Sequence, residues 1–530
     1  MKNRKKLVFL ILLLFVASIC GGLFLTTAYA EEHKHDHDHD HEHGDCEGKG
    51  KLLVILHTND VHGQLKSLRD KRMSKDSKVG GSAYLSTLIN DLRKKYKGHV
   101  LLLDAGDIAQ GTPVSNHFKG IPVVDVMNYM KYDVMTIGNH EFDWRQPALK
   151  AMIDRAKFPV VCANIVYKKD PSKTIHNVKP YVIKKVGDIK VGILGLCTPY
   201  TVTITKKENV KGLLFLNVAK TSKKYIPIMK KEGANIIIAL THLGIEDDIK
   251  LAKAVKGIDV IVGGHSHSKL KDPKKVGNTL IVQAKSKGRY LGKLELRYCM
   301  GHKRIKSYSE KDVLIPIVNS KLKADEKVLG IIDKYEKEIA PMMRKVVGKT
   351  ELDLTKATGK DHKDSVLGNL ICDAMIDKSG ADVSIYNPGG IRAEVYAGDI
   401  TVENMITVLP FDNWLVTCDL RGKELVEIFE HAASRKGSAQ VSGITFEIDY
   451  SKPKGKRLSN VKIAGKPIDK NKIYTITTID FLFTRGDGYD FKAAKNVKYG
   501  DHIRDVVTEY VRKKSPLRIK PDKRIKSVGK

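Results

Sequence analysis

The sequence has few cysteines for its length, and that scarcity excludes one class of protein at once. Seven cysteines in 530 residues cannot cross-link a fold of this size, so hydrophobic cores and not a disulfide scaffold must stabilise it. No two cysteines have the CxxC spacing of a structural zinc or redox site. The cysteines that lie mainly among apolar residues are therefore expected to be buried thiols: Cys162, Cys197, Cys299, Cys372 and Cys418.

Acidic residues are also too few to balance the basic ones. Lys and Arg number 93 against 61 Asp and Glu, which gives a formal net charge of +32. A content of 42% hydrophobic and 29% charged residues is typical of a folded soluble protein and excludes a disordered chain, a collagen or a multi-span membrane protein. The positive field favours anionic partners such as phosphorylated substrates or an anionic cell wall. Because the basic residues are dispersed without a recognition-helix or aromatic-stripe pattern, specific nucleic-acid binding is not expected.

Residues 1–30 have the three parts of a secretory signal peptide. Four basic residues within the first six precede an apolar run over 7–25, and Ala28-Tyr29-Ala30 places small residues where a signal peptidase reads them. The sequence thus predicts export to the periplasm, the cell surface or the extracellular space. An uncleaved anchor is the alternative, because about 18 apolar residues suffice to span a bilayer.

Residues 31–50 form a histidine-rich segment with no apolar residues to bury. Its imidazoles alternate mainly with carboxylates, at His33, His35, His37, His39, His41 and His43. Such a stretch is either a loose site for transition-metal ions or a solvated polar spacer.

From Lys51 onward, short apolar runs alternate with helical segments. The runs are typical of strands whose sheet is covered on both faces, and they lie at 52–56, 100–103, 134–137, 160–161, 191–194, 236–240 and 260–262. Helices are expected at 83–96 and 148–156 between them. This alternation predicts an α/β layered domain over residues 51–300.

The remainder of the chain is expected to form a linker and a second domain. A linker at 301–346 contains an amphipathic pattern that predicts one helix over 320–347. Residues 347–530 then form an α+β domain, with a helix at 368–378, strands near 383–386 and 473–478, and a basic tail from 511. The sequence carries no signal of an oligomeric state.

Polar residues follow five of the apolar runs of the first domain directly. They are His57 to His62, Asp104 to Asp107, Asn139 to Asp143, His242, and His265 with His267. Because ligands at the carboxyl ends of sheet strands converge on one crevice, we expect these side chains to meet. Mixed oxygen and imidazole donors suit two divalent transition ions, and the aspartate of a Gly-Asp turn has the short reach needed to bridge them.

At this point the sequence resembles a known family. Asp60-Val61-His62, Gly106-Asp107, Gly138-Asn139-His140-Glu141, His242 and Gly264-His265-Ser266-His267 match the calcineurin-like metallophosphoesterases in order and spacing. Asn387-Pro388-Gly389-Gly390-Ile391-Arg392, Leu409-Pro410-Phe411-Asp412-Asn413 and Gly486-Asp487-Gly488-Tyr489 resemble the C-terminal domain of the secreted 5′-nucleotidases and UDP-sugar hydrolases. The resemblance implies a four-layer α/β/β/α sandwich followed by a second, α+β, substrate-binding domain.

The resemblance also implies roles for individual residues. One ion would be held by Asp60, His62, Asp107 and His267, and the other by Asp107, Asn139, His242 and His265, the ions being Zn, Mn or Co. His140 and Asp143 match the catalytic dyad. The substrate-binding positions match Asn387, Arg392, Phe411, Asn413, Phe481 and Asp487, of which Phe411 and Phe481 would sandwich the nucleobase.

The implied activity is hydrolysis of the 5′-phosphate ester of nucleotides by a hydroxide shared between two ions. A 2′,3′-cyclic-nucleotide phosphodiesterase or a UDP-sugar hydrolase on the same site is the alternative, and a metal-scavenging surface protein is a more distant one. Arg485 and Lys363 depart from the residues that relatives often carry, which leaves the choice among nucleotide substrates open.

Overall fold

The structure is a computed structural model. It describes residues 50–530, apart from 71–72, 76, 357–363, 436–438, 521 and 529–530. The expected signal peptide, nearly all of the histidine-rich segment and Lys363 lie outside the described residues. In the described part of the chain, every helix is too short or too polar to cross a membrane.

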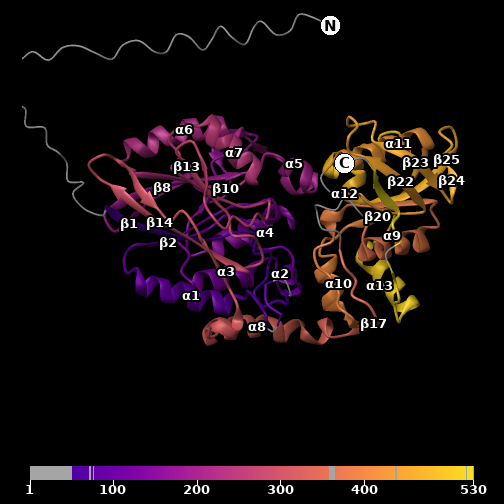
Figure 1. The fold of residues 1–530 in the computed structure, drawn as a ribbon, viewed down its shortest axis with the longest axis horizontal. Helices are drawn as coiled ribbons and strands as arrows, with labels where there is room; N and C mark the ends of the chain where they lie inside the picture. The colour runs from indigo at the N-terminus through magenta and orange to yellow at the C-terminus, as the bar shows by residue number, and fades with distance from the viewer. Residues whose placement is uncertain are drawn as a thin grey trace, which may run out of the picture. The chain divides into compact units, whose positions relative to one another are not determined.

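Two sheets, stacked face to face, form the centre of the first domain (Figure 1). The first sheet has the order β15(Arg304–Tyr308), β14(Tyr290–Cys299), β1(Lys51–Thr58), β2(Val100–Asp104), β3(Val134–Thr136), β4(Val160–Val161), with β16(Leu314–Pro316) also pairing with β14. The second has the order β12(Lys274–Val276), β13(Thr279–Val282), β11(Val260–Gly263), β10(Ile236–His242), β8(Ile189–Cys197), β7(Tyr181–Val186). A small third sheet comprises β6(Asp170–Thr174), β5(Ile165–Tyr167) and β9(Leu213–Phe215).

Helices cover the outer faces of both large sheets, which gives the four expected layers. The helical elements are α1(Ser82–Lys95), α2(Pro113–His117), α3(Ile121–Tyr129), η1(His140–Phe142), α4(Arg145–Arg155), α5(Thr201–Ile204), η2(Lys207–Val210), α6(Val218–Lys231), α7(Ile245–Ala254), η3(Asn319–Lys321) and α8(Glu326–Met343). In β1, Leu53 and Ile55 pack between the sheets, whereas Val54 and Leu56 belong to the core shared with the helices. Burial on both faces explains why these strands are continuously apolar.

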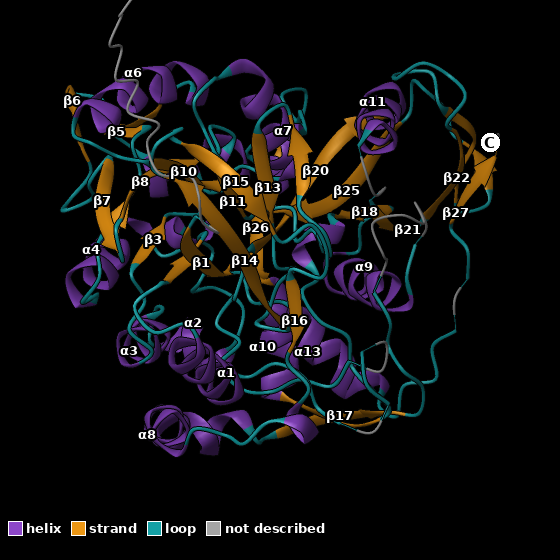
Figure 2. Cartoon of the chain, turned by 60° about the vertical axis from the view of Figure 1, so that its left-hand side comes forward, coloured by secondary structure: helices purple, strands orange, loops and turns teal. Residues whose placement is uncertain are grey.

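The second domain has one core and mixed α and β elements (Figure 2). Its largest sheet has the order β21(Gln440–Ser442), β18(Val383–Tyr386), β25(Ile473–Ile479), β20(Trp414–Arg421), β26(Lys495–His502). A second sheet has the order β24(Lys466–Pro467), β23(Leu458–Ile463), β22(Ile444–Asp449), β27(Ile525–Val528). The third is the pair β17(Val346–Thr350) and β19(Gly398–Thr401). Its helical elements are α9(Val366–Ser379), η4(Pro388–Gly390), α10(Val402–Val408), α11(Gly422–Ser434), α12(Asp480–Phe483), η5(Gly486–Gly488) and α13(Ile503–Lys514). The basic C-terminal stretch contributes β27, which pairs with β22.

Two details differ from the sequence-based expectations. Helix α8 is shorter than 320–347, because the Asp325 side chain accepts hydrogen bonds from the backbone N–H groups of Lys327 and Val328 and so fixes the start at Glu326. Cys299 is buried, as expected, but it is disulfide-bonded and not a thiol. The other four cysteines named above are free and buried, as expected.

Candidate metal centre

The loops that follow the central strands meet at one edge of the two sheets. Strands β1, β2 and β3 run parallel, as do β10 and β11, so their carboxyl ends lie together. Backbone N–H groups of Asp60 and His62 donate to Gly106 O and Asp107 O, each at 2.9 Å, which joins the first two loops. The N–H of His265 donates to both Asp60 carboxylate oxygens, at 3.1 and 3.0 Å, and thereby connects the two sheets.

Potential ligand atoms gather here in overlapping groups. The groups are Asp60, His62 and His267; His62, Asp107 and His140; and Asp107, His242 and His265, and within each the ligand atoms lie within 4.8 Å of one another. All seven metal-ligand positions implied by the resemblance lie in these groups except Asn139, which adjoins His140 in the chain. The tertiary structure thus brings residues at or just after the ends of five strands into one small volume.

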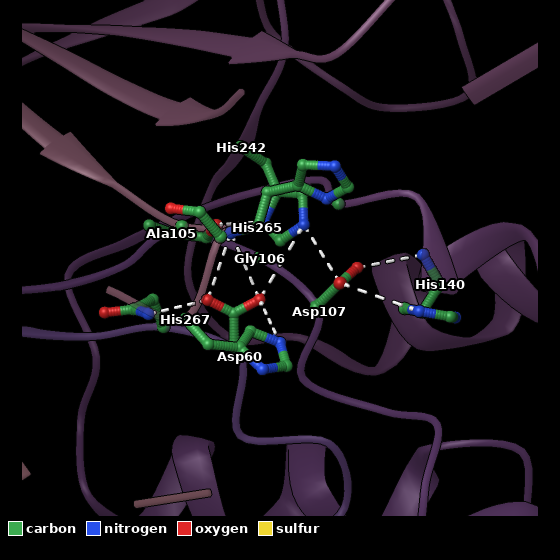
Figure 3. A network of polar contacts seen from close by, with 12 residues as sticks. Asp60, Ala105, Gly106, Asp107, His140, His242, His265 and His267 are labelled. Carbon is green, nitrogen blue, oxygen red and sulfur yellow. Dashed lines mark hydrogen bonds and ion pairs between the residues drawn. The ribbon is translucent and has the colours of Figure 1, made fainter. Parts of the chain in front are cut away.

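The Asp107 carboxylate lies at the centre of the groups. Figure 3 shows it between His242 and His140. Its Oδ2 is 2.9 Å from His242 Nε2, 3.9 Å from His62 Nε2 and 4.0 Å from His140 Nε2. One oxygen therefore faces histidines of both the Asp60 group and the His242 group, which is the position that a bridging ligand requires.

The backbone at this edge is held in a conformation that few L-residues adopt. Asp60, His62, Asp107, His265 and His267 all have φ between 50° and 75°. Such strain costs about 1–3 kcal/mol per residue and persists only where surrounding contacts enforce it. Five strained residues in one cluster of polar side chains indicate a functional site.

Glu141 enforces the conformation of the Asp107 loop. Its buried carboxylate accepts hydrogen bonds from the backbone N–H groups of Asp107, Ile108 and Gly138, at 2.9, 2.9 and 2.6 Å. Glycine at 138 is required as well, because a Cβ there would lie 2.2 Å from Asp107 Oδ1. Glu141 belongs to the Gly138-Asn139-His140-Glu141 motif, but the sequence analysis gave it no role. Its position directly after His140 was the one feature of the sequence that pointed to a function.

The charges of the cluster favour occupation by cations. Burial raises the pKa of Asp107, but His242 and His140 outweigh this and hold it well below the usual range. Burial and the charge of Arg392 hold the pKa of His62 well below its usual value. Burial, with the charge of His242, lowers the pKa of His265 to about 4. Asp107 as a carboxylate and His62 and His265 as neutral imidazoles are thus in the forms that bind metals. His242 differs: burial lowers its pKa, but Asp107 outweighs this and raises it to about 10, so this imidazole must lose its proton when it binds an ion.

Two buried polar atoms support the same conclusion. Among the described residues, Asn139 Oδ1 has no hydrogen-bond partner, and the contact of His242 Nε2 is the 2.9 Å ion pair with Asp107 Oδ2, without hydrogen-bond geometry. Buried polar atoms are rarely left unsatisfied, and a bound ion is one of the partners that can satisfy them. An amide oxygen and an imidazole nitrogen are suitable donors for a divalent transition ion, so the donor set fits such ions.

His140 and Asp143, the expected dyad, are in direct contact. His140 Nδ1 lies 2.7 Å from Asp143 Oδ2. Burial opposes protonation of the imidazole, but the charges of Asp143 and Asp107 raise the pKa of His140 above its usual value. The structure also stacks the ring on Phe411 of the second domain, with centroids 5.6 Å apart.

Arg392 of the second domain contacts the candidate metal centre. Its Nη2 lies 3.1 Å from His62 Nε2, and its guanidinium carbon is 5.8 Å from the Phe411 ring centroid. A guanidinium there presents a planar fork that suits phosphate oxygens. The Nζ of Lys287, which no sequence motif singled out, donates to Arg392 O at 3.0 Å.

The other expected substrate positions are divided between two places. Asn387 Nδ2 donates to Asp487 Oδ2 at 3.1 Å, and Asn387 Oδ1 is buried without a partner among the described residues. Arg435, unforeseen in the sequence, donates from Nη2 to Asp487 Oδ1 at 2.9 Å. The ring of Phe481 lies against Gly486 in the same region. Asn413 is buried, and its carbonyl accepts from Ile503 N–H at 2.9 Å.

Arg485, which departs from the residue that relatives often carry, forms an ion pair in the second domain. Its Nη2 lies 3.5 Å from Asp490 Oδ2, and about half of the side chain, 49%, is exposed. The described contacts thus pair Arg485 with Asp490, whereas Arg392 is the cation in contact with a candidate metal ligand, His62.

A four-layer sandwich with two sets of carboxylate and imidazole donors, joined at one aspartate, defines the class of two-metal phosphoesterases. Residues 53–269 match the calcineurin-like phosphoesterase family, and residues 346–496 match the 5′-nucleotidase C-terminal domain. The chain belongs to the family that combines these two domains. It is a hydrolase of phosphoric esters that uses two divalent metal ions, as the motifs predicted.

Known proteins of the same architecture resemble the whole described chain. Protein UshA of Yersinia enterocolitica is 33% identical over 524 residues, covering 88% of this chain and 92% of that protein. The trifunctional nucleotide phosphoesterase protein YfkN of Bacillus subtilis is 30% identical over 87% of this chain, which spans only about a third, 34%, of that longer protein. The crystal structure of a 5′-nucleotidase precursor from Thermus thermophilus has a TM-score of 0.84 at 29% identity, covering 91% of this chain and all of that one.

Proposed function

We propose that the protein hydrolyses the 5′-phosphate ester of nucleotides outside the cytoplasm. The observation that carries this proposal is the meeting of three features at one point. Arg392 contacts His62 of the candidate metal centre and the ring of Phe411, and Phe411 in turn stacks on His140. A phosphate-binding cation, metal-ligand candidates and an aromatic face therefore adjoin one another, as a nucleotide requires.

In this proposal the seven ligand candidates hold two ions. Asp60, His62, Asp107 and His267 form one set, and Asp107, Asn139, His242 and His265 form the other, with Asp107 common to both. Bound divalent ions would lower the pKa of water and neutralise phosphoryl oxygens. The protein holds the two ligand sets close together through the hydrogen bonds of Glu141 and the backbone hydrogen bonds between the loops.

His140 acts on the phosphate and not on the ions. Asp143 orients the imidazole through the 2.7 Å contact to Nδ1, so that Nε2 faces Asp107 and the site. A protonated imidazole there donates a hydrogen bond where negative charge develops during phosphoryl transfer, an effect worth about 10²-fold or more. Arg392 adds a fixed positive charge beside it.

The second domain recognises the nucleoside. Phe411 and Phe481 provide aromatic faces for the base, and such stacking contributes about 1–3 kcal/mol per base with little preference among bases. Asp487 presents a carboxylate for the ribose hydroxyls, and Asn387, which contacts it, presents an amide for the base. The buried Asn387 Oδ1 gains a partner when a ligand binds. Asn413 completes the set from the segment that carries Phe411.

Export, with contact to an anionic cell wall, belongs to the same proposal. The signal-peptide pattern of residues 1–30 and the net charge of +32 support it. The histidine-rich segment would then be either a metal-binding arm or a spacer at the start of the exported protein.

A substrate and metal panel tests the function. The purified protein is stripped with a chelator, each of Mn, Co and Zn is restored, and phosphate release is measured from nucleoside monophosphates, 2′,3′-cyclic nucleotides and UDP-sugars. Elemental analysis of the same samples counts bound ions. We expect two ions per chain and the highest kcat/KM for a 5′-monophosphate. A higher kcat/KM for a cyclic nucleotide or a UDP-sugar would replace the proposed substrate with that alternative.

A further inference from the structure

A cavity of about 950 Å³ opens on one side of the candidate metal centre. His267 and Arg392 line its inner end, and its walls come from both domains. A volume of this size is in the range of ligand-binding pockets, about 300–1,000 Å³. Phe411, Phe481, Asn387 and Asp487 are not among the described residues that line it, so the cavity is separate from the proposed nucleoside pocket.

The inner end of this cavity is rich in basic side chains. Lys287, Arg289 and Lys356 line it together with Arg392. Burial, followed by the charges of the other three, lowers the pKa of Lys287 to about 7. Glu394 opposes this effect, and Asp70 forms an ion pair with Arg289 at 3.1 Å. Among the described residues that line the cavity, basic side chains still outnumber acidic ones, and like charges repel one another in a low-dielectric site. An anion with more than one charge would relieve the repulsion.

The position of Lys287 is fixed by bonds to the candidate metal centre itself. Its backbone N–H donates to Asp60 O at 2.8 Å. Asn59, the residue before Asp60, donates from Nδ2 to Lys285 O at 2.7 Å and accepts from Ala284 N–H at 2.7 Å. Three hydrogen bonds therefore hold the loop between β13 and β14 to the loop that follows β1.

The backbone of the same loop is strained at two lysines. Lys285 and Lys287 have φ of 66° and 58°, in the left-handed region that non-glycine residues rarely adopt. The Nζ of Lys287 then reaches Arg392 O at 3.0 Å, which aims the ammonium toward the end of the cavity where Arg392 lies. The ammonium is thus positioned before any ligand arrives, which lowers the entropic cost of binding.

We propose that Lys287, with Arg289 and Lys356, forms a second phosphate subsite beside the metal centre, for a phosphate group other than the scissile one. The inference rests on the proposed function, because the scissile phosphate must occupy the metal centre. Arginine binds phosphate through a planar fork and lysine as a point charge, and the cluster offers both. Its occupant is either the second phosphate of a substrate that carries two or free orthophosphate.

The test compares Lys287→Met with the charge-conserving Lys287→Arg and with Lys231→Met. Lys231 is an exposed residue in the last turn of α6, so its replacement removes the same charge elsewhere. KM is measured for a nucleoside monophosphate and its diphosphate at fixed free metal concentration, and the inhibition constant is measured for orthophosphate. These readouts separate a local subsite from the overall positive field.

If the subsite binds a second substrate phosphate, Lys287→Met raises the ratio of diphosphate KM to monophosphate KM about tenfold, the usual size of a charge-assisted hydrogen bond. If it binds orthophosphate, the inhibition constant rises about tenfold while that ratio stays constant. Lys287→Arg should remain near the wild type in either case. Equal values for Lys287→Met and Lys231→Met in both readouts overturn the proposal.

Failure of the proposed function gives a different result. In that case the wild-type protein releases no phosphate from either nucleotide, whatever stands at residue 287. The dissociation constant of pyrophosphate, which carries two phosphate groups, is then measured by calorimetry as a direct test of the subsite. We expect Lys287→Met to weaken this binding about tenfold relative to Lys231→Met, and equal affinities would again refute the subsite.

Discussion

The candidate metal centre and the proposed nucleoside pocket are built in different ways. The ligand candidates follow the ends of five strands in two packed sheets, and backbone hydrogen bonds join their loops. The pocket residues lie in loops and short helices of the second domain, where Asp487 is held by contacts with the side chains of Asn387 and Arg435. The first site is fixed by the fold and the second by a few contacts, so changes should be far more damaging in the first.

Asp107→Asn should have the largest effect. The substitution removes one of the two carboxylates of the centre and weakens the residue common to both ligand sets. We expect kcat/KM to fall by about 10³-fold or more and fewer than two ions to remain bound. Elemental analysis and kinetics on the same preparation measure both quantities. An Asp107→Asn enzyme with full metal content and full activity would exclude the bridging role.

His140→Asn should separate catalysis from metal binding. Because His140 is proposed to contact phosphate, kcat should fall by about 10²-fold while two ions remain bound. Asp143→Asn, which leaves the imidazole in place but weakens its orientation, should cost less. If His140→Asn instead loses an ion, the residue belongs to the ligand group that it shares with His62 and Asp107.

Glu141→Gln sharpens the comparison, because the Glu141 carboxylate accepts its hydrogen bonds from backbone N–H groups of the metal-binding loops. The amide NH₂ would face donors that now meet a carboxylate, so the Asp107 loop should loosen. We expect metal affinity to fall about 10- to 100-fold, as for other residues that support metal ligands. Saturating metal should restore most of the kcat, whereas a loss that metal does not restore would mean that Glu141 acts on the substrate.

Phe481→Ala should affect only the pocket. Loss of one stacking face should raise KM for nucleoside monophosphates about tenfold. Hydrolysis of p-nitrophenyl phosphate, which has no nucleobase, serves as the internal control and should change little. Equal losses for both substrates would show that Phe481 supports the fold and not the base.

The smallest expected effect concerns the contact between the domains. Lys206 Nζ donates to Asp412 O at 2.7 Å and to Asp480 Oδ2 at 2.9 Å, next to Phe411 and Phe481 respectively. Because a third of the Lys206 side chain, 34%, is exposed, the pair contributes at most about 1 kcal/mol. Lys206→Met should therefore raise nucleotide KM about threefold without loss of metal. A double-mutant cycle with Asp480→Asn measures the coupling, and additive effects would show that the pair does not position the aromatic residues.

Most of the first domain could be predicted because its signals are local and strong. The continuous apolar runs identified β1, β2, β8, β10 and β11, and the polar residues after them identified the ligand candidates. The limits of α8 were wrong because its amphipathic pattern extends past Asp325, whose side chain caps the helix. The disulfide at Cys299 was missed because its apolar neighbours gave no sign of oxidation.

The sequence by itself determined the α/β class, the family and the set of residue types that can hold two ions, because strand periodicity and short motifs are local properties. Only the tertiary structure decided that Glu141 holds the Asp107 loop, that Arg435 holds Asp487, and that Lys287 joins Arg392 beside the metal centre. These partners lie 34, 52 and 105 positions apart in the chain. Contacts at such separations depend on how sheets and domains pack, and no local pattern in the sequence records them.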